Sequence, residues 1–255
     1  MIIRIVILAL LTASTAVAQS TVAIHDIQGP GTTSPLAGQT VTTTGIVTGV
    51  KSNGFFLQAP DASADANPAT SEGIFVFTST APSVARANRV NVTGRVTEYI
   101  PSADPRSPSL TELSGSPSVS VVAESAALPA EVVLTAAQLP ASGGPNVLEH
   151  LEGMRVHVDQ LLAIAPTGGS VEETTAKGTT NGVFWGVIAG VTRPMREPGI
   201  DVLDALPSGS PCCVPRFDGN PERLRIESAA QTGAPALEVN TGATVRNIFG
   251  VLDYA

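Results

Sequence analysis

Apolar and polar side chains alternate from residue 89 to residue 99. Val90, Val92 and Val96 share one set of positions, and the polar residues between them would point the other way. This period of two is typical of a β-strand with one buried and one solvated face. Gly94 falls in the apolar row, where a glycine commonly marks a bend at a barrel corner. The segment is therefore predicted to be a curved strand of a closing sheet.

Short segments of this kind recur at regular spacing through the first half of the chain. They are expected at Val41–Val50, Phe55–Ala59, Ile74–Thr78, Arg89–Tyr99 and Val119–Ala123. Strands spaced in this way favour a small barrel. Turns are frequent, because the chain holds 24 glycines and 20 prolines, while charged residues make up only 14% and aromatic residues only 4%. The predicted fold class is all-β.

A second set of segments follows a stretch rich in proline and glycine. The predicted divisions are a first barrel at residues 19–125, a linker with a short helix at 126–146 and a second barrel at 147–255. Strands of the second barrel are expected at 154–161, Val183–Ala189, Leu224–Glu227 and Val245–Tyr254. The last segment stops inside an apolar strand pattern, which predicts that the second barrel is truncated at its end. A final strand that docks into the sheet is the alternative.

The amino terminus has the pattern of an export signal. Arg4 precedes an apolar run from Ile5 to Leu11, and the small residues at 15–18 supply a cleavage site. The apolar run is shorter than the roughly 18 to 20 residues that a membrane-spanning helix needs. Residues 1–18 are therefore predicted to be a cleaved signal peptide. The mature chain is expected to be secreted or periplasmic, without a membrane partner.

Net charge and cysteine content limit which ligands and which disulfides this chain can have. The formal net charge is −8, so any contact with nucleic acid has to use a local basic patch. Cys212 and Cys213 are adjacent, and neighbouring Cα atoms lie only about 3.8 Å apart, below the usual disulfide span. A framework of disulfides is therefore excluded, whereas two free thiols, a strained vicinal bridge and an intermolecular link all stay open.

The first predicted barrel, called the first module below, also resembles a known family; the second predicted barrel is called the second module. The matching residues are Ile27, Gln28, Gly29, Ser34, Pro35, Gly38, Val41, Thr42, Gly45, Val47, Gly54, Phe55, Phe56, Leu57, Gln58, Thr70, Ser71, Gly73, Ile74, Phe75 and Val76. This ordered series resembles the OB-fold-like region of secreted bacterial nucleases of the endonuclease/exonuclease/phosphatase superfamily. The second module is similar to the segment that follows in such proteins, through Glu152, Gly153, Met154 and residues 215–221.

The resemblance implies two tandem OB-like β-barrels ahead of a phosphodiesterase domain in the same polypeptide. That domain would need a divalent metal such as Mg²⁺, and its metal-binding Asn and Glu and its Asp-His pair would follow Ala255. The parent protein is then expected to be a nuclease, with this chain as its non-catalytic region. No catalytic residue is predicted within the chain, because His25, His150 and His157 lack ligand spacing and are expected at the surface.

An acidic loop has the spacing of calcium ligands. Asp61, Ser63, Asp65 and Asn67 fall at alternate positions, and Glu72 is the twelfth residue counted from Asp61. Oxygen ligands so spaced suit a weakly bound Ca²⁺ in an extracellular setting. The sixth position holds alanine instead of the glycine that a sharp turn needs, so an EF-hand is not indicated. A solvated polar loop is the alternative.

Two consecutive aromatic residues suggest a nucleic-acid contact. Phe55 and Phe56 are neighbours in one predicted strand, so one ring is expected to face outward. OB folds bind single strands by stacking bases on such rings beside basic side chains, and Lys51, Arg89 and Arg95 are the candidates here. The alternative is that packing absorbs both rings.

These observations lead to one function hypothesis and one alternative. The hypothesis is a region that binds and positions DNA or RNA for an extracellular nuclease, with weak, salt-dependent affinity. The alternative is a structural module, or one that binds protein or polysaccharide, without contact to nucleic acid.

Overall fold

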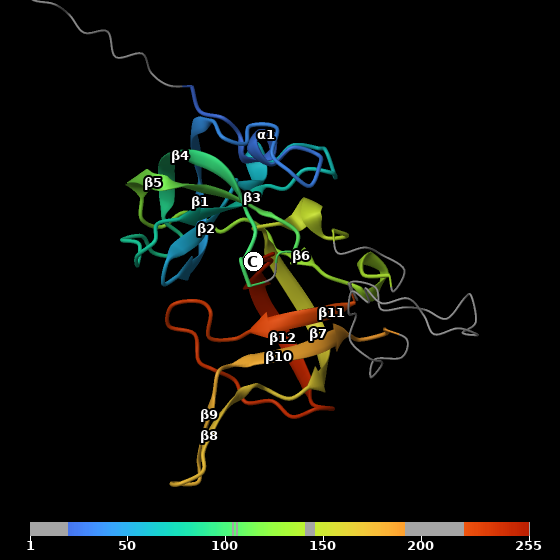
Figure 1. The fold of residues 1–255 in the computed structure, drawn as a ribbon. Coiled ribbons are helices and arrows are strands. Elements are labelled where there is room, and N and C mark those ends of the chain that lie inside the picture. The colour runs from blue at the N-terminus through green and yellow to red at the C-terminus, as the bar shows by residue number, and fades with distance from the viewer. Residues whose placement is uncertain (1–19, 104, 106, 141–145, 192–221, 255) are drawn as a thin grey trace, which may run out of the picture.

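The computed structural model describes residues 20–103, 105, 107–140, 146–191 and 222–254. It is an all-β protein, as predicted, with two main sheets stacked along one axis (Figure 1). The predicted signal peptide at 1–18 and the Cys212–Cys213 pair lie outside the described residues. No described helix is both long enough and apolar enough to cross a membrane.

The first sheet is a closed ring of five strands. They are β1 (Thr40–Lys51), β2 (Gly54–Gln58), β3 (Gly73–Phe77), β4 (Arg89–Tyr99) and β5 (Leu110–Ala123). Hydrogen bonds join them in the order β1-β2-β3-β5-β4, and β4 pairs with β1 to close the ring. Only the β3–β5 pair is parallel. Four of the predicted strands are confirmed almost to the residue, whereas β5 begins well before the predicted Val119.

The ring closes around the alternating valines of β4. Val90, Val92 and Val96 are fully buried in its interior, which confirms the predicted face. The pairing of β4 with β5 shifts register between Thr93 and Arg95, so the strand bends where the glycine was expected to mark a corner. The sequence pattern therefore predicts both the buried face and the curvature.

A short helix covers the ring. α1 (Ile24–Gln28) places Ile24 and Ile27 in the ring's apolar core, with almost no exposed surface. It ends at Gly29, whose φ of 71° is easily adopted only by glycine. One helical turn is enough to bury both isoleucines, and the sequence pattern did not predict this helix.

The second sheet is open among the described strands. Its elements are β6 (Val132–Val133), β7 (Arg155–Ala165), β10 (Val183–Ile188), β11 (Arg223–Glu227) and β12 (Thr244–Val251). They pair in the order β11-β10-β7-β12, and β6 adds to β7. Three short 3-10 turns complete the description: η1 (Asp61–Ser63), η2 (Ala136–Gln138) and η3 (Glu149–Leu151). A second closed barrel therefore stays a prediction.

A separate hairpin projects from the second sheet. It consists of β8 (Gly169–Glu172) and β9 (Lys177–Thr180), which pair only with each other among the described strands. Every residue of both strands is exposed, and the hairpin stands clear of the body in Figure 1. The sequence pattern did not predict it.

Candidate functional site

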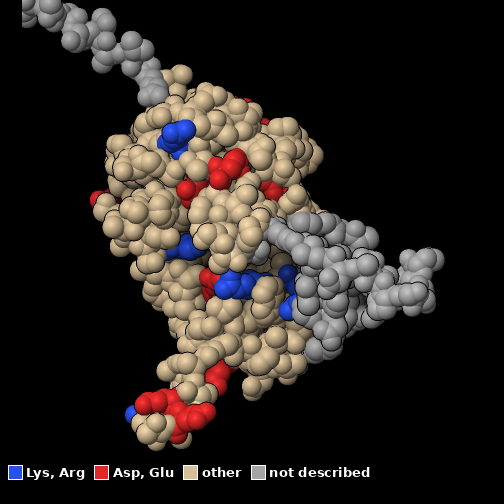
Figure 2. Space-filling model, viewed as in Figure 1, with Lys and Arg blue, Asp and Glu red and all other residues tan. Residues whose placement is uncertain are grey.

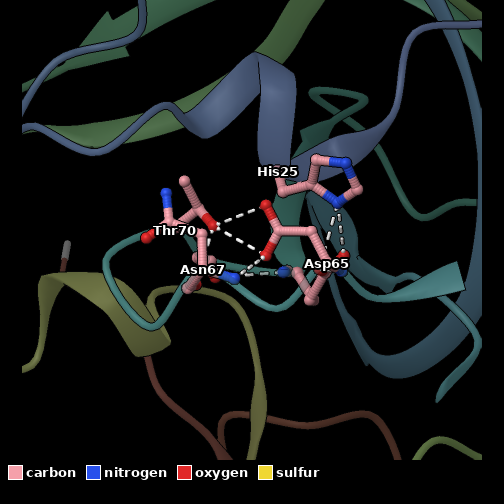
Figure 3. Close-up of polar contacts among 7 residues, drawn as sticks. His25, Asp65, Asn67 and Thr70 are labelled. Carbon is pink, nitrogen blue, oxygen red and sulfur yellow. Dashed lines mark hydrogen bonds and ion pairs between the residues drawn. The ribbon is translucent and has the colours of Figure 1, made fainter.

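Three titratable side chains converge beneath helix α1 (Figure 3). His25 Nδ1 lies 3.0 and 3.1 Å from the two carboxylate oxygens of Glu72. The backbone N–H of Asp65 donates to Glu72 Oε1 at 2.6 Å. One ligand atom from each of the three residues lies within 4.8 Å of the other two. Since α1 and the loop that follows β2 are distant in sequence, only the folded ring brings this cluster together.

Electrostatics favour the charged form of His25. Burial alone would lower the pKa of its imidazole, but the hydrogen bond and the charge of Glu72, with further charges from Asp65 and Asp26, raise it overall. The same contacts hold the imidazole against the Glu72 carboxylate. A metal ion could enter only by displacing its Nδ1 proton.

The structure brings together two of the five predicted calcium ligands. Asp65 and Glu72 converge, but the Asp61 carboxylate accepts from the backbone N–H of Ala130 at 3.0 and 3.2 Å. Ser63 is exposed in the 3-10 turn that Asp61 begins. The side chain of Asn67 accepts from the N–H of residue 69, within the loop. The loop is thus a set of side-chain-capped turns rather than a twelve-residue ion cradle.

Hydrogen bonds also hold Asp65 in place. Its carboxylate accepts from the N–H of Asn67 at 2.9 Å and from the hydroxyl of Thr70 at 3.1 Å. An imidazole nitrogen with two carboxylates is a donor set typical of Zn²⁺ and similar metals, whereas Ca²⁺ prefers oxygen ligands alone. Calcium binding stays a prediction. Sequence spacing could not have added His25, because it lies 47 residues from Glu72.

The predicted stacking rings are both buried. Phe55 lies in the core of the ring and is fully buried. Phe56 points to the other face, as predicted, but only 2% of it is exposed. It packs beside Phe75, with ring centroids 4.9 Å apart, and against residues of the second sheet. Packing therefore absorbs both rings, which was the alternative to an exposed ring, because the second module covers the face of Phe56.

The predicted basic residues are not gathered into one patch. Lys51 Nζ forms an ion pair with Asp253 Oδ2 at 2.8 Å and lies 5.4 Å from the ring centroid of Phe75. Arg89 and Arg95 are exposed, but six residues of extended strand separate them by roughly 20 Å. On the face that Figure 2 shows, the described basic side chains form no continuous patch, and acidic ones gather at the hairpin tip.

A buried carboxyl joins the two modules. Glu152 is fully buried, and its Oε1 accepts from Gln28 Nε2 and from the backbone N–H of Thr111, both at 3.0 Å. Its Oε2 has no hydrogen-bond partner among the described residues. Burial raises the pKa of this carboxyl to about 8, and the charge of Glu149 adds to the rise. Glu152 is therefore uncharged at neutral pH.

The backbones of the first ring and of the second module also meet beside Glu152, and this region of contact is called the junction. A Cβ at Gly73 would lie 2.2 Å from the carbonyl carbon of Gly153, so no larger residue fits there. Gln28 Nε2 also donates to the carbonyl of Gly73 at 2.6 Å, and the hydroxyl of Ser71 donates to the carbonyl of Glu152 at 2.5 Å. The first ring and the second module are therefore packed through their main chains.

A groove of about 490 Å³ lies between β11 and β12. Every described residue of β12 from Val245 to Val251 lines it, as do residues 224–227 of β11. Lys51 and Phe56 of the first ring contribute to its wall. Residues of the 228–237 segment that follows β11, and the side chains of Val156, Val158 and Phe184, also line it.

The geometry above defines the class of the protein: an all-β chain with one closed ring packed against a sheet that is open among the described strands. Comparison with known families assigns the chain to one of them. The chain belongs to a domain family of unknown function (DUF8508), which matches residues 117–255, from the middle of β5 through the second sheet. No curated protein and no solved structure matches the chain.

Proposed function

We propose that this protein is a non-catalytic positioning region of an exported polypeptide, which holds two β-modules in one fixed orientation. The observation that carries the proposal is the junction at Glu152. A fully buried carboxyl that accepts hydrogen bonds from Gln28 and Thr111 ties the second module to the first ring. Such a bond network resists rotation because breaking it would leave buried polar groups unpaired.

Further contacts widen the junction beyond a single bond. Lys51 of the ring pairs with Asp253, which follows β12, and the hydroxyl of Ser107 donates to the carbonyl of Tyr254 at 2.9 Å. Gln58 Oε1 accepts from the backbone N–H of Arg155 at 2.8 Å. These contacts come from different strands and loops of the ring. The junction is therefore an area of contact, as a rigid platform requires.

We infer that the first ring is an OB-fold, in line with the resemblance seen in the sequence. Its strand order β1-β2-β3-β5-β4 and its parallel β3–β5 pair fit a five-stranded Greek-key barrel. The second module, which repeats part of this order, is proposed as a second barrel of the same kind. Attachment to a nuclease domain remains part of the same proposal and rests on the resemblance alone.

NMR relaxation of the ¹⁵N-labelled mature chain tests the positioning role. The two modules are expected to share one rotational correlation time. Replacement of Gln28 by Ala removes one bond to Glu152 and is expected to increase relative motion, whereas Lys177→Ala, in the exposed hairpin β8–β9, leaves it unchanged. Separate correlation times for the two modules in the unmodified chain would contradict the proposal.

Nucleic-acid binding is a second proposal, favoured by the exposure of Arg89 and Arg95 on β4. Fluorescence anisotropy with labelled single-stranded DNA and RNA, at low and raised salt, measures it. Weak binding that salt removes is expected. An Arg89→Ala/Arg95→Ala variant should lose it, while Lys177→Ala in the hairpin should not. No binding at low salt would leave the protein as a purely structural or protein-binding module.

A further inference from the structure

The open sheet repeats the pairing of the closed ring strand by strand. In the ring, β1 pairs antiparallel with β2 and β4, and β2 pairs antiparallel with β3. In the second sheet, β7 pairs antiparallel with β10 and β12, and β10 pairs antiparallel with β11. The strands β7, β10, β11 and β12 therefore correspond in order and direction to β1, β2, β3 and β4.

The correspondence stops at the fifth strand. In the ring, β5 lies between β3 and β4, parallel to β3 and antiparallel to β4. Among the described residues of the second sheet, no strand lies between β11 and β12. The groove of about 490 Å³ occupies this position. Its two borders are β11, which pairs with β10, and β12, which pairs with β7.

The apolar side chains that face the groove differ in burial from their counterparts in the ring. Partly exposed residues of the two bordering strands are Leu224, Ile226, Val245 and Ile248. Fully buried counterparts in β3 and β4 are Ile74, Val76, Val90 and Val92. In the ring, the fifth strand β5 covers these buried residues. No described strand covers the four residues beside the groove, which accounts for their exposure.

The chain leaves β12 at the end of the groove where an antiparallel neighbour would have to begin. After Val251, the backbone of Leu252 exchanges hydrogen bonds with Gly153 and Met154. Asp253, which lines the groove, pairs with Lys51 at its wall. The carboxyl end of the described chain thus lies between the two modules, as Figure 1 shows.

We propose that this groove binds a fifth strand, supplied by the part of the polypeptide that follows residue 255. The strand runs antiparallel to β12 and parallel to β11, with apolar side chains at alternate positions over Leu224 and Ile248. About five residues suffice to pair with β11 along its length. The inference goes beyond the proposed positioning role, because it rests on strand pairing and not on the junction.

Hydrogen exchange with mass spectrometry tests the proposal. The chain ending at residue 255 is compared with the same chain extended by the next thirty or so residues that its gene encodes. Exchange of the amides in β11 and β12 is expected to slow about 100-fold on extension. Exchange in β4 should stay the same. Unchanged exchange in both groove strands, or a stop codon directly after residue 255, would overturn the proposal.

Cysteine crosslinking then identifies the occupant. Arg225 of β11 is replaced by Cys in a chain whose Cys212 and Cys213 are serine, and single cysteines are placed along the extension. Crosslinks within one chain, in a parallel register, are the expected result. Crosslinks between two copies, or to cysteines placed within residues 192–221, would assign the groove to another occupant and overturn it. An Ile248→Asp variant should abolish the protection, whereas Arg246→Ala should retain it.

Discussion

The two sheets begin with the same four-strand order but differ in how completely they enclose a core. In the ring, the inward side chains of β3 and β4 have no exposed surface, because β5 bridges the two strands. In the second sheet, the matching side chains border an open groove. The comparison shows that strand order alone does not enclose a core. Four strands set the curvature of each sheet, and a fifth strand buries the side chains inside it.

The largest effect is expected from one substitution made in both sheets. Leu113→Ala, in the strand that closes the ring, should cost about 2–5 kcal/mol of unfolding free energy, because it leaves a cavity in a fully buried site. Leu224→Ala, beside the groove, should cost roughly 1 kcal/mol, because that side chain is already partly exposed. Urea unfolding of both variants measures the difference. Equal costs would mean that the groove is as well packed as the ring.

A second prediction compares two glycines. Gly73→Ala should cost about 1–3 kcal/mol, because its Cβ would strike the backbone of Gly153 at the junction. Gly250→Ala, in β12, is the matched control, since nothing lies within 4 Å of its Cβ position. Thermal unfolding compares the two. A neutral Gly73→Ala variant would show that the modules can separate without loss, against the fixed junction.

The third prediction concerns pH and the carboxyl between the modules. The pKa of Glu152 is raised from 4.5 to about 8, so the folded state holds a proton that the unfolded state releases. Its contribution to stability is full below about pH 4.5 and is lost as the pH rises through 8. Glu152→Gln should therefore be more stable than the unmodified chain at pH 8.5, by at least the roughly 1.4 kcal/mol of one pKa unit.

Urea unfolding at pH 5 and pH 8.5 measures how Glu152→Gln changes the unfolding free energy at each pH. Glu238→Gln, an exposed position in the second module, is the control and should change neither value. Some pH dependence should remain in the Glu152→Gln variant, because burial also raises the pKa of Glu112 and of Glu149 to about 7. A variant less stable than the unmodified chain at pH 8.5 would show that the charged form is the native one.

The smallest effect is expected at the cluster beneath α1. An ion held by His25, Asp65 and Glu72 at ten times its dissociation constant should raise the unfolding free energy by about 1.4 kcal/mol. Zn²⁺ and Ca²⁺ are compared by thermal unfolding against a chelator, with Cys212 and Cys213 replaced by serine. His25→Gln should remove the response to Zn²⁺, and Glu172→Gln, in the hairpin, should keep it. An unchanged midpoint with both ions would leave His25 as a structural hydrogen-bond partner of Glu72.

Much of the fold could be predicted from local patterns, and the exceptions have physical causes. Alternation located β4 and the first half of β1, where one face is buried, and short apolar runs located β2 and β3, which are buried on both faces. It missed the first half of β5, where Gly115 and Pro117 interrupt the pattern. It missed α1 because five residues are too short to show a helical period. The open groove could not be predicted, because enclosure depends on strands that are distant in sequence.

The candidate sites were less predictable. Sequence spacing named Asp65 and Glu72 among five candidate ligands, and the residue that converges with these two in the structure is a histidine from another element. Alternation correctly placed Phe55 and Phe56 on opposite faces, yet it could not reveal that the second module covers Phe56. In both cases the deciding contact joins segments far apart in the chain. Local pattern carries no information about such contacts.

The projecting hairpin β8–β9 has a practical consequence. Its strands share no pairing with the other described sheets, and all of its residues are exposed. The tip between Glu172 and Lys177 can therefore be lengthened without disturbing either core. It is a natural place to insert a fluorescent label or an affinity epitope, so that the ends of the chain stay unaltered when binding partners are sought.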